Sequence, residues 1–517
     1  MKTWENNVAH QHAEVLPYDS RIFTHIMETV SLSKRVRFLA LASSGLFTDG
    51  YLNLCIGLIV PMVGYVYFKD NKNAVPVHDS DTIKASLGMG MILGQLSFGL
   101  LGDTLGRHRV YGRELIVTTI GTLMCILLPW RGLSHSGVIA WLSCWRVFTG
   151  FGIGGDYPMS SALAAEKAPI GSRAVMVLIV FSCIGLGAIT SSIVYLILLT
   201  AFKSSIDHDI NNLEYVWRLL LGLGIVPCAM TVYARLKIKE TLPYKQYVLK
   251  RDELLGKDKR RPKDQMQDFK SYFSKRKHAR VLFAVSAVWF LFDIAFYGIN
   301  LNQSVILGRI GYGRGPTPYQ TLRNTAVGNI IVQSAGYLPG YWIGIFLPDW
   351  IGRIRLQFWG SLLVAAVYAI WAGITNHTNT AGLTAIFAVS QLVLNSSVNV
   401  TTFLLPVEVF PTRVRGTAHG IAAASGKVGA IITAMCFGTV NEKIGIQGNL
   451  GLFAGIMVLA ALCTLLIPET KGKTIEEIEH GVLYGHSIQD RTVTYASSVD
   501  DRISYVEHVD ANYGEQA

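Results

Sequence analysis

Long apolar segments recur about a dozen times along this chain of 517 residues, each near the 17–25 residues that a helix needs to cross a bilayer. This repetition constrains the fold more than any other feature. Inside a bilayer every backbone polar group must be hydrogen-bonded within the protein, which leaves only helices or closed barrels. Half of the residues are hydrophobic and 16% are charged. The sequence therefore predicts an all-α membrane protein with about twelve transmembrane helices.

Basic residues cluster in the loops on one side of these segments: Arg107 with Arg109, Arg353 with Arg355, and the polar stretch 237–279. Cytoplasmic loops of membrane proteins carry such an excess of Lys and Arg. We therefore expect these loops to face the cytoplasm of a multi-pass plasma-membrane protein. An even number of spans then puts both termini in the cytoplasm. Topology accounts for the net charge of +11, so we expect the lipid bilayer, and no nucleic acid, as a partner.

The spacing of the apolar segments divides the chain into five parts. We predict a cytoplasmic N-terminal arm (1–36), a six-helix half (37–236), a cytoplasmic central loop (237–279), a second six-helix half (280–467) and a cytoplasmic tail (468–517). The seven cysteines lie in or beside apolar segments without a CxxC pair, which predicts neither a metal site nor a disulfide framework. We expect no cofactor, and a carrier rather than an enzyme.

One glycosylation motif lies in a short loop between two late apolar segments. Asn376 begins the sequon Asn376-His377-Thr378. The expected topology places this loop outside the cell, so Asn376 is the predicted acceptor in a eukaryote.

The two halves of the chain repeat the same polar motifs at nearly the same offset: Asp103-x-x-Gly-Arg107 with Asp349-x-x-Gly-Arg353, Glu166 and Arg173 with Glu408 and Arg415, and Asp49 with Asp293. Three repeats in register indicate an internal duplication. Duplicated halves in secondary transporters hold the substrate site between them, near the middle of the membrane. The sequence therefore predicts a central solute site.

The repeated charged motifs also predict a network at the cytoplasmic mouth. The acid of each Asp-x-x-Gly-Arg loop can cap a helix start and pair with an arginine of a neighbouring span. The predicted gate residues are Asp103, Arg107, Arg146, Glu166, Arg173, Asp349, Arg353, Glu408 and Arg415. A static clamp that only fixes the helix arrangement is the alternative, and for Arg146, inside the fourth span, a structural ion pair.

Four acids lie inside the apolar segments: Asp49, Glu114, Asp156 and Asp293. An ionisable residue in hydrocarbon is unfavourable unless it faces a partner or water, so it marks a function by default. Burial and nearby charges can bring the pKa of such a carboxyl towards neutrality, as proton coupling requires. We predict these four as proton-coupling residues. For Glu114 the alternative is a simple pair with a loop arginine.

A second set of polar residues in the spans suits an anion rich in oxygen. Trp289, Asp293 and Tyr297 are spaced to share one helix face. Lys427 lies inside the eleventh segment and Asn399 inside the tenth. An ammonium, an amide and a phenol can all hydrogen-bond such an anion. The alternatives are a structural ion pair for Lys427 and a helix-packing contact for Asn399.

At these residues the chain resembles the major facilitator superfamily, and more narrowly the phosphate:proton symporters of fungi and plants. The matching segments are GIGGDYPMS (152–160), WFLFDIAFYG (289–298) and EVFPTRVRGTAHGIAAASGKVGA (408–430). The resemblance implies the major facilitator fold and alternating access. It also implies that the substrate site is lined by Tyr157, Trp289, Asp293, Tyr297, Asn399 and Lys427, with Asp49, Glu114 and Asp156 on the proton route.

Two departures from that family bear on the substrate. Its phosphate carriers typically read Asp-x-Tyr-Asp in the first span, where this chain reads Asp49-Gly-Tyr51-Leu52-Asn53, and Ile184 stands where they place a glutamine. A lost polar contact weakens the binding of a compact anion and leaves room for a larger one. The Asp-Gly-Tyr-x-Asn pattern is similar to the fungal glycerophosphoinositol transporters.

The resulting expectation is a proton symporter that imports a glycerophosphodiester, such as glycerophosphoinositol or glycerophosphocholine. Inorganic phosphate is the alternative substrate. A non-transporting nutrient receptor with the same fold is a further alternative. A drug exporter shares the Asp-x-x-Gly-Arg loops but lacks the GDYP and SGKVGA segments.

Overall fold

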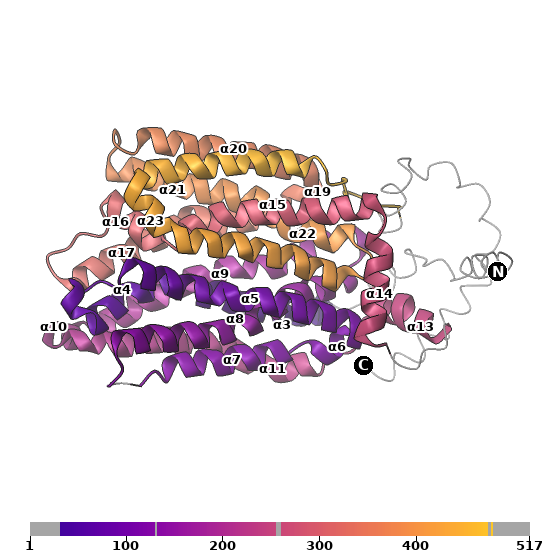
Figure 1. Cartoon of the computed structure of the whole chain (residues 1–517), viewed down its shortest axis with the longest axis horizontal. Helices are drawn as coiled ribbons and strands as arrows, with labels where there is room; N and C mark the ends of the chain where they lie inside the picture. Colours follow the sequence, from indigo (N-terminus) through magenta and orange to yellow (C-terminus); the bar gives the residue numbers. More distant parts are fainter. Residues whose placement is uncertain (1–31, 130–131, 255–259, 474–476, 479–517) are drawn as a thin grey trace.

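The computed structural model describes residues 32–129, 132–254, 260–473 and 477–478. The N-terminal arm, apart from its last residues, and most of the tail lie outside these described residues. Within the described ranges the regular secondary structure is helical. Most helices follow the long axis of the molecule, whereas α14 (Pro262–Phe273) lies across one end (Figure 1). We call this the α14 end, and the opposite end, which holds α16 (Gln303–Ile310), the α16 end.

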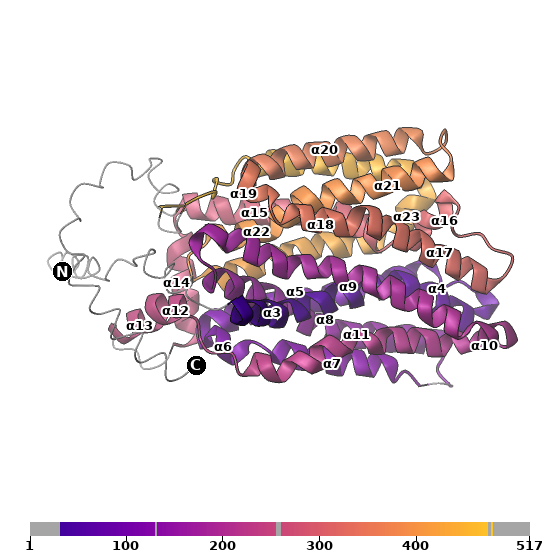
Figure 2. The same ribbon diagram turned by 180° about the vertical axis from the view of Figure 1, so that it is seen from behind.

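The first half of the bundle contains six spanning segments. They are α3 with α4 (Leu32–Leu54, Ile56–Tyr67), α5 (Val77–Leu105), α7 (Arg113–Ile126), α8 (His135–Glu166), α9 (Arg173–Ala201) and α11 (Leu213–Leu236). Short helices α6 (Arg107–Val110) and α10 (Lys203–His208) lie in its connections. Figures 1 and 2 show this half, in indigo to magenta, along one side of the molecule.

The second half also has six spanning segments. They are α15 (Arg276–Asn300), α17 with α18 (Pro318–Val332, Leu338–Gly344), α20 (Arg353–Ile374) after the short α19 (Leu347–Ile351), α21 with α22 (Thr380–Leu394, Val400–Val409) and the two legs of α23 (Arg415–Thr464). α23 reverses at Gly445, whose φ of 68° and ψ of −178° suit glycine almost alone. Figure 1 shows its legs as separate orange and yellow helices.

These segments agree with the predicted all-α fold. Some of them are hard to recognise as membrane spans from length and hydropathy. By length and composition, nine of the described helices can cross a membrane. Three further crossings escape that criterion for different reasons. α7 has only 14 residues, α17 with α18 carries many polar residues such as Asn329, Gln333 and Ser334, and α23 counts once although it crosses twice.

The two halves pack along two seams, α5 against α23 and α9 against α17 and α18. Large apolar side chains such as Met230, Trp350 and Trp359 remain 66–80% exposed on the outside of the bundle. Such exposure would be unfavourable in water but is expected where lipid is the solvent. The predicted domain limits of the halves stay a prediction.

The central segment 237–279, predicted as a loop, is largely helical. It contains α12 (Leu242–Tyr244), α13 (Lys250–Leu254) and α14. Pro262 occupies the first position of α14, and Asp264 accepts a hydrogen bond from the Arg261 N–H at 3.0 Å, a favourable helix start. The connection between the halves thus contains helices that its high charge density conceals in the sequence, because α14 buries only one narrow face.

Candidate functional site

A small cavity lies between the two halves. Its volume is about 30 Å³, room for about two water molecules. The structure brings all six residues of the predicted substrate site together around it, with Asp49 and Ile184: Asp49, Tyr157, Ile184, Trp289, Asp293, Tyr297, Asn399 and Lys427. These residues come from α3, α8, α9, α15, α23 and the π-helical turn at Asn395–Asn399.

The charges in the cavity are one ammonium and two carboxylates. Lys427 donates a hydrogen bond to Asp293 at 2.7 Å, and its ammonium lies 4.6 Å from the centre of the Tyr297 ring. Asp49 accepts a hydrogen bond from the Tyr157 hydroxyl at 2.5 Å, while its second oxygen has no partner among the described residues. With both acids ionised the site carries one net negative charge, so uptake of a proton makes room electrostatically for an anion.

Neutral donors complete the lining. Asn399 donates hydrogen bonds to the Tyr341 hydroxyl and to Asn395, both at 2.7 Å. Asn53 of the first half donates to the Tyr297 hydroxyl of the second at 3.2 Å. Neither Asn53 nor Tyr341 was predicted as a site residue: Asn53 was noted only as a departure from the family's first-span pattern, and Tyr341 belongs to no motif. A π-helical turn, often found at functional sites, ends at Asn399 and positions it.

Aromatic rings occupy the space beside Ile184. Phe181 stacks on Phe403 with ring centres 4.1 Å apart, and Tyr341 lies 5.4 Å from Phe181. The expectation that Ile184 opens room for a larger phosphodiester is therefore not met in this conformation. The cavity is too small in this conformation to admit a phosphodiester.

A second buried acid cluster lies within the first half. Arg235 of α11 donates to Asp156 at 2.5 Å and to Glu114 at 3.1 Å, and all three side chains are at most 2% exposed. Arg235 also donates to the backbone oxygens of Leu41 and Ala42. The partner of Glu114 is thus an arginine of a spanning helix, not the loop arginine considered from sequence. Two carboxylates share one guanidinium, so one proton would balance the cluster.

The two acid clusters are close neighbours along α3. Asp49 lies one helical turn after Gly45, and a Cβ atom on Gly45 would come within 2.1 Å of Asp156 Oδ2. Only glycine therefore allows Asp156 to approach this turn. The arrangement places Asp156 and Glu114 behind the cavity, on the side of the α14 end.

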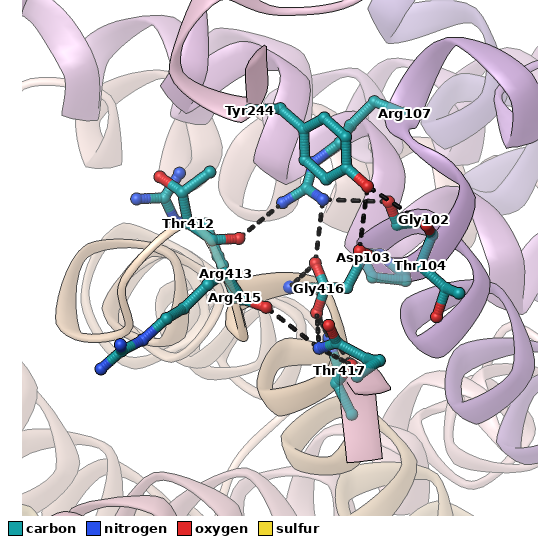
Figure 3. Close-up of polar contacts among 12 residues, drawn as sticks. Gly102, Asp103, Thr104, Arg107, Tyr244, Thr412, Arg413, Arg415, Gly416 and Thr417 are labelled. Carbon is teal, nitrogen blue, oxygen red and sulfur yellow. Dashed lines mark hydrogen bonds and ion pairs between the residues drawn. The ribbon is translucent and has the colours of Figure 1, made fainter. Parts of the chain in front are cut away.

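At the α14 end the side chains of the first Asp-x-x-Gly-Arg loop contact the second half (Figure 3). Asp103 accepts hydrogen bonds from the N–H groups of Gly416 and Thr417, at 3.1 and 2.7 Å, and so caps the start of α23. Arg107 pairs with Asp103 at 3.0 Å and donates to the backbone oxygen of Thr412 at 2.9 Å. Gly106 between them has a φ of +94°, which explains the glycine of the motif.

Glu166 joins this network from the end of α8. It accepts hydrogen bonds from Arg107 at 3.0 Å, from Arg415 of the second half at 3.1 Å and from Thr241 at 2.6 Å. Burial lowers the pKa of Arg107, but the charges of Glu166 and Asp103 outweigh it and raise the pKa overall. Arg173 begins α9 near Arg415. The network closes the α14 end between the halves.

The repeated motif in the second half makes different contacts. Arg353 pairs with Asp349 at 2.8 Å and with Glu408 at 2.9 Å. Glu408 also accepts from Thr470 at 2.5 Å, and Glu469 accepts from the Arg353 N–H at 3.0 Å. All these partners belong to the second half or to the segment that follows α23. Among the described contacts this copy therefore ties its own half together, whereas the first copy bridges the halves.

Arg146 is wrongly placed in the predicted gate. It lies 20 residues before Glu166 on the single helix α8, which corresponds to about 30 Å along the helix axis. Its Nε donates to the backbone oxygen of Ile83 at 3.1 Å.

Asn376 lies in the loop between α20 and α21 and is exposed. This loop is at the end opposite α14, and glycosylation there stays a prediction (Figure 1).

Comparison with known proteins places this geometry in context. The sequence profile of the family described as "Sugar (and other) transporter" matches residues 38–481. An inorganic phosphate transporter of Saccharomyces cerevisiae is 34% identical over 524 residues, covering 90% of this chain and 88% of its own. The repressible high-affinity phosphate permease of Neurospora crassa is 34% identical and covers 86% of each chain.

Among solved structures, the major facilitator superfamily proton:xylose symporter XylE has a similar fold. One structure of it, bound to 6-bromo-6-deoxy-D-glucose, has a TM-score of 0.66, with 20% identity and coverage of 87% of this chain and 99% of XylE. A partially occluded inward-open form of XylE from E. coli has a TM-score of 0.65 and 16% identity. At this identity the likeness concerns the fold.

Proposed function

This chain belongs to the sugar (and other) transporter family and has the major facilitator fold, and from that premise we propose that it is a proton-coupled symporter for inorganic phosphate. Curated relatives from yeast, Neurospora and rice, 32–34% identical over most of their length, are phosphate carriers by name. The small cavity also argues against a bulky phosphodiester. Inorganic phosphate replaces the glycerophosphodiester expected from the Asp-Gly-Tyr-x-Asn pattern.

The observation that carries the proposal is the cavity with Lys427 between two carboxylates. An anion next to Asp293 and Asp49 is repelled unless a proton neutralises one of them. Protonation of Asp293 weakens its bond to Lys427 and frees the ammonium for a phosphate oxygen. Asn399, Tyr157 and Tyr297 supply neutral donors. Proton and phosphate therefore favour each other's binding at one site, which is the requirement for symport.

The proton has an onward route through the first half. Asp156 and Glu114 share Arg235 one helical turn behind Asp49, and their second oxygens have no partner among the described residues. A proton released from Asp49 can be held there, because one guanidinium balances only one of the two carboxylates. We assign these acids to proton release on the α14 side.

The orientation follows from charge. The α14 end carries the basic segments around Arg107, Arg353 and 237–279, so we place it in the cytoplasm and the α16 end outside the cell. The protein then takes up phosphate across the plasma membrane. Opening of the α14 end requires the bonds of Asp103 and Glu166 to the second half to break. These bonds act as the inner gate, and the Arg353 network as a clamp within one half.

Uptake of radiolabelled phosphate into proteoliposomes tests the function. We expect an imposed proton gradient to drive accumulation by the full-length protein. Unlabelled phosphate should compete strongly and glycerophosphocholine weakly. The reverse order of competition would favour a diester carrier, and binding without accumulation a receptor. Asp293→Asn should lose the response to the gradient, whereas Asp70→Asn, a matched change at an exposed residue of the short 3-10 helix Lys69–Asn71, should keep it. A gradient response retained by Asp293→Asn would contradict the coupling mechanism.

A further inference from the structure

A second, smaller cavity adjoins the central one on the side of the α16 end. Its volume is about 10 Å³, room for about one water molecule. Asn53, Tyr297 and Lys427 line both cavities, and Lys84 of α5 lines only the second. Two ammonium groups thus face one small space between the halves. Lys84 belongs to none of the motifs that identify the central site.

Lys84 is held across the two halves. Its side chain is 7% exposed, and its ammonium donates to Asn302 Oδ1 at 2.9 Å, just after α15 of the second half. Asn302 is itself oriented, because its amide donates to the backbone oxygen of Gly298 at 3.0 Å. Asp81 is the nearest carboxylate, 3.9 Å away, which is long for a tight ion pair. The ammonium therefore keeps much of its capacity to attract an anion.

The contacts around Lys84 also close the α16 end. Besides the Lys84–Asn302 bond, the Ser304 hydroxyl of the second half donates to the backbone oxygen of Gly57 in the first at 2.7 Å. When the halves separate at this end, both bonds break. Lys84 then projects its charge into the opened mouth, on the approach to Lys427. A buried ammonium that is released only by opening is available to substrate from one side of the membrane alone.

We propose that Lys84 forms an outer phosphate-binding subsite, which receives the anion in the outward-open state and passes it to Lys427. The bond to Asn302 then replaces the anion and latches the α16 end. This inference rests on the proposed phosphate symport and on the orientation given above. It adds a second cation on the uptake path, which raises the local concentration of anion before the central site is reached.

Substitutions can separate the effect of the Lys84 charge from that of the Lys84–Asn302 bond. Lys84→Gln removes the charge but keeps an amide donor for Asn302, whereas Asn302→Leu removes the latch and keeps the charge. We expect Lys84→Gln to raise the KM for phosphate uptake about tenfold, with a near-normal maximal rate and a weaker dependence on ionic strength. Lys84→Arg should retain the KM. Asp81→Asn should lower it, since the nearest competing carboxylate is gone.

The outcomes distinguish the proposal from the function it rests on. A wild-type protein that fails to accumulate phosphate in proteoliposomes overturns both. A wild-type protein that transports phosphate, with an unchanged KM and salt dependence in Lys84→Gln and Asp81→Asn, overturns the subsite alone and leaves Lys84 a latch. If Lys84→Gln does not fold, Lys84→Arg and Asp81→Asn still decide, because a purely structural role predicts no fall in KM for Asp81→Asn.

Discussion

Replacing Glu166 by glutamine should open the α14 end. The carboxylate accepts hydrogen bonds from Arg107, Arg415 and Thr241, and the two ion-pair partners and Glu166 itself are at most 2% exposed. Glutamine has nearly the same shape but no charge, and its NH2 group cannot accept from a guanidinium. The Arg415 bond joins the two halves, so it exists only while this end is closed. Its weakening therefore acts on the closed state alone.

The expected size follows from the strength of such bonds. A hydrogen bond to a charged group contributes about 1.5–3 kcal/mol, and deep burial leaves little solvent screening to reduce it. Losing that amount from the closed state multiplies the open population about 10- to 100-fold, at about 1.4 kcal/mol per factor of ten. Because glutamine has nearly the same shape as glutamate, we expect the Glu166→Gln protein to fold, so a larger open population reports the lost bond.

Cysteine labelling can measure the open population. Ala423 is buried on α23, one turn from Lys427 towards the α14 end, so Ala423→Cys reports opening there. Exposed Cys144 and Cys436 are first replaced by serine. A membrane-impermeant thiol reagent applied from the α14 side should label the Glu166→Gln protein about 10- to 100-fold faster than its parent.

The repeated half supplies the matched control. Glu408 holds Arg353 and Thr470, all on the side of the second half, so Glu408→Gln should lower stability without speeding the labelling. Equal acceleration by both substitutions, or none by Glu166→Gln, would refute the assignment of the inner gate to the first copy of the motif.

Three further outcomes are expected. Arg235→Met should lower the free energy of unfolding by about 3–5 kcal/mol, because two buried carboxylates lose their cation, and adding Asp156→Asn should restore part of the melting temperature. Gly445→Ala should destabilise the turn of α23 by about 1–3 kcal/mol, whereas Gly451→Ala, in open surroundings on the second leg, should not lower the melting temperature. In a eukaryotic host, Asn376→Gln should abolish an endoglycosidase-sensitive shift in electrophoretic mobility; a wild-type protein without that shift would show that the sequon is not used.

Much of the fold could be predicted because the bilayer restricts the choices. An apolar segment of sufficient length must be a helix there, whatever its neighbours are. Prediction was weakest where this constraint is relaxed, outside the hydrocarbon. Segment 237–279 is charged throughout, and its helix α14 buries little more than Gln265 and Tyr272 on one face. A face of that size leaves almost no periodic signal against a charged background.

The residues of the candidate site likewise fall into those that the sequence predicted and those that it did not. Asp293 and Lys427 stand out in sequence because a charge in an apolar span is rare, and the structure brings them together as a pair. Arg235 lies at the end of its span, where arginines are common, so sequence gave no reason to connect it with Glu114. Arg146 misled for the opposite reason: its charge suggested a gate, but its depth in α8 separates it from the α14 end.

The amino-acid sequence alone determined the membrane-spanning helices, the duplication and most of the polar residues at the central cavity, because each of these depends on residue type and local spacing. Only the tertiary structure decided which charges are partners. Asp103 and Asp349 occupy equivalent motifs, yet one caps a helix of the other half and one stays within its own. Lys84 and Asn302 are far apart in sequence and meet only because the halves pack together. Such pairings arise from the closure of the whole bundle, which no local pattern encodes.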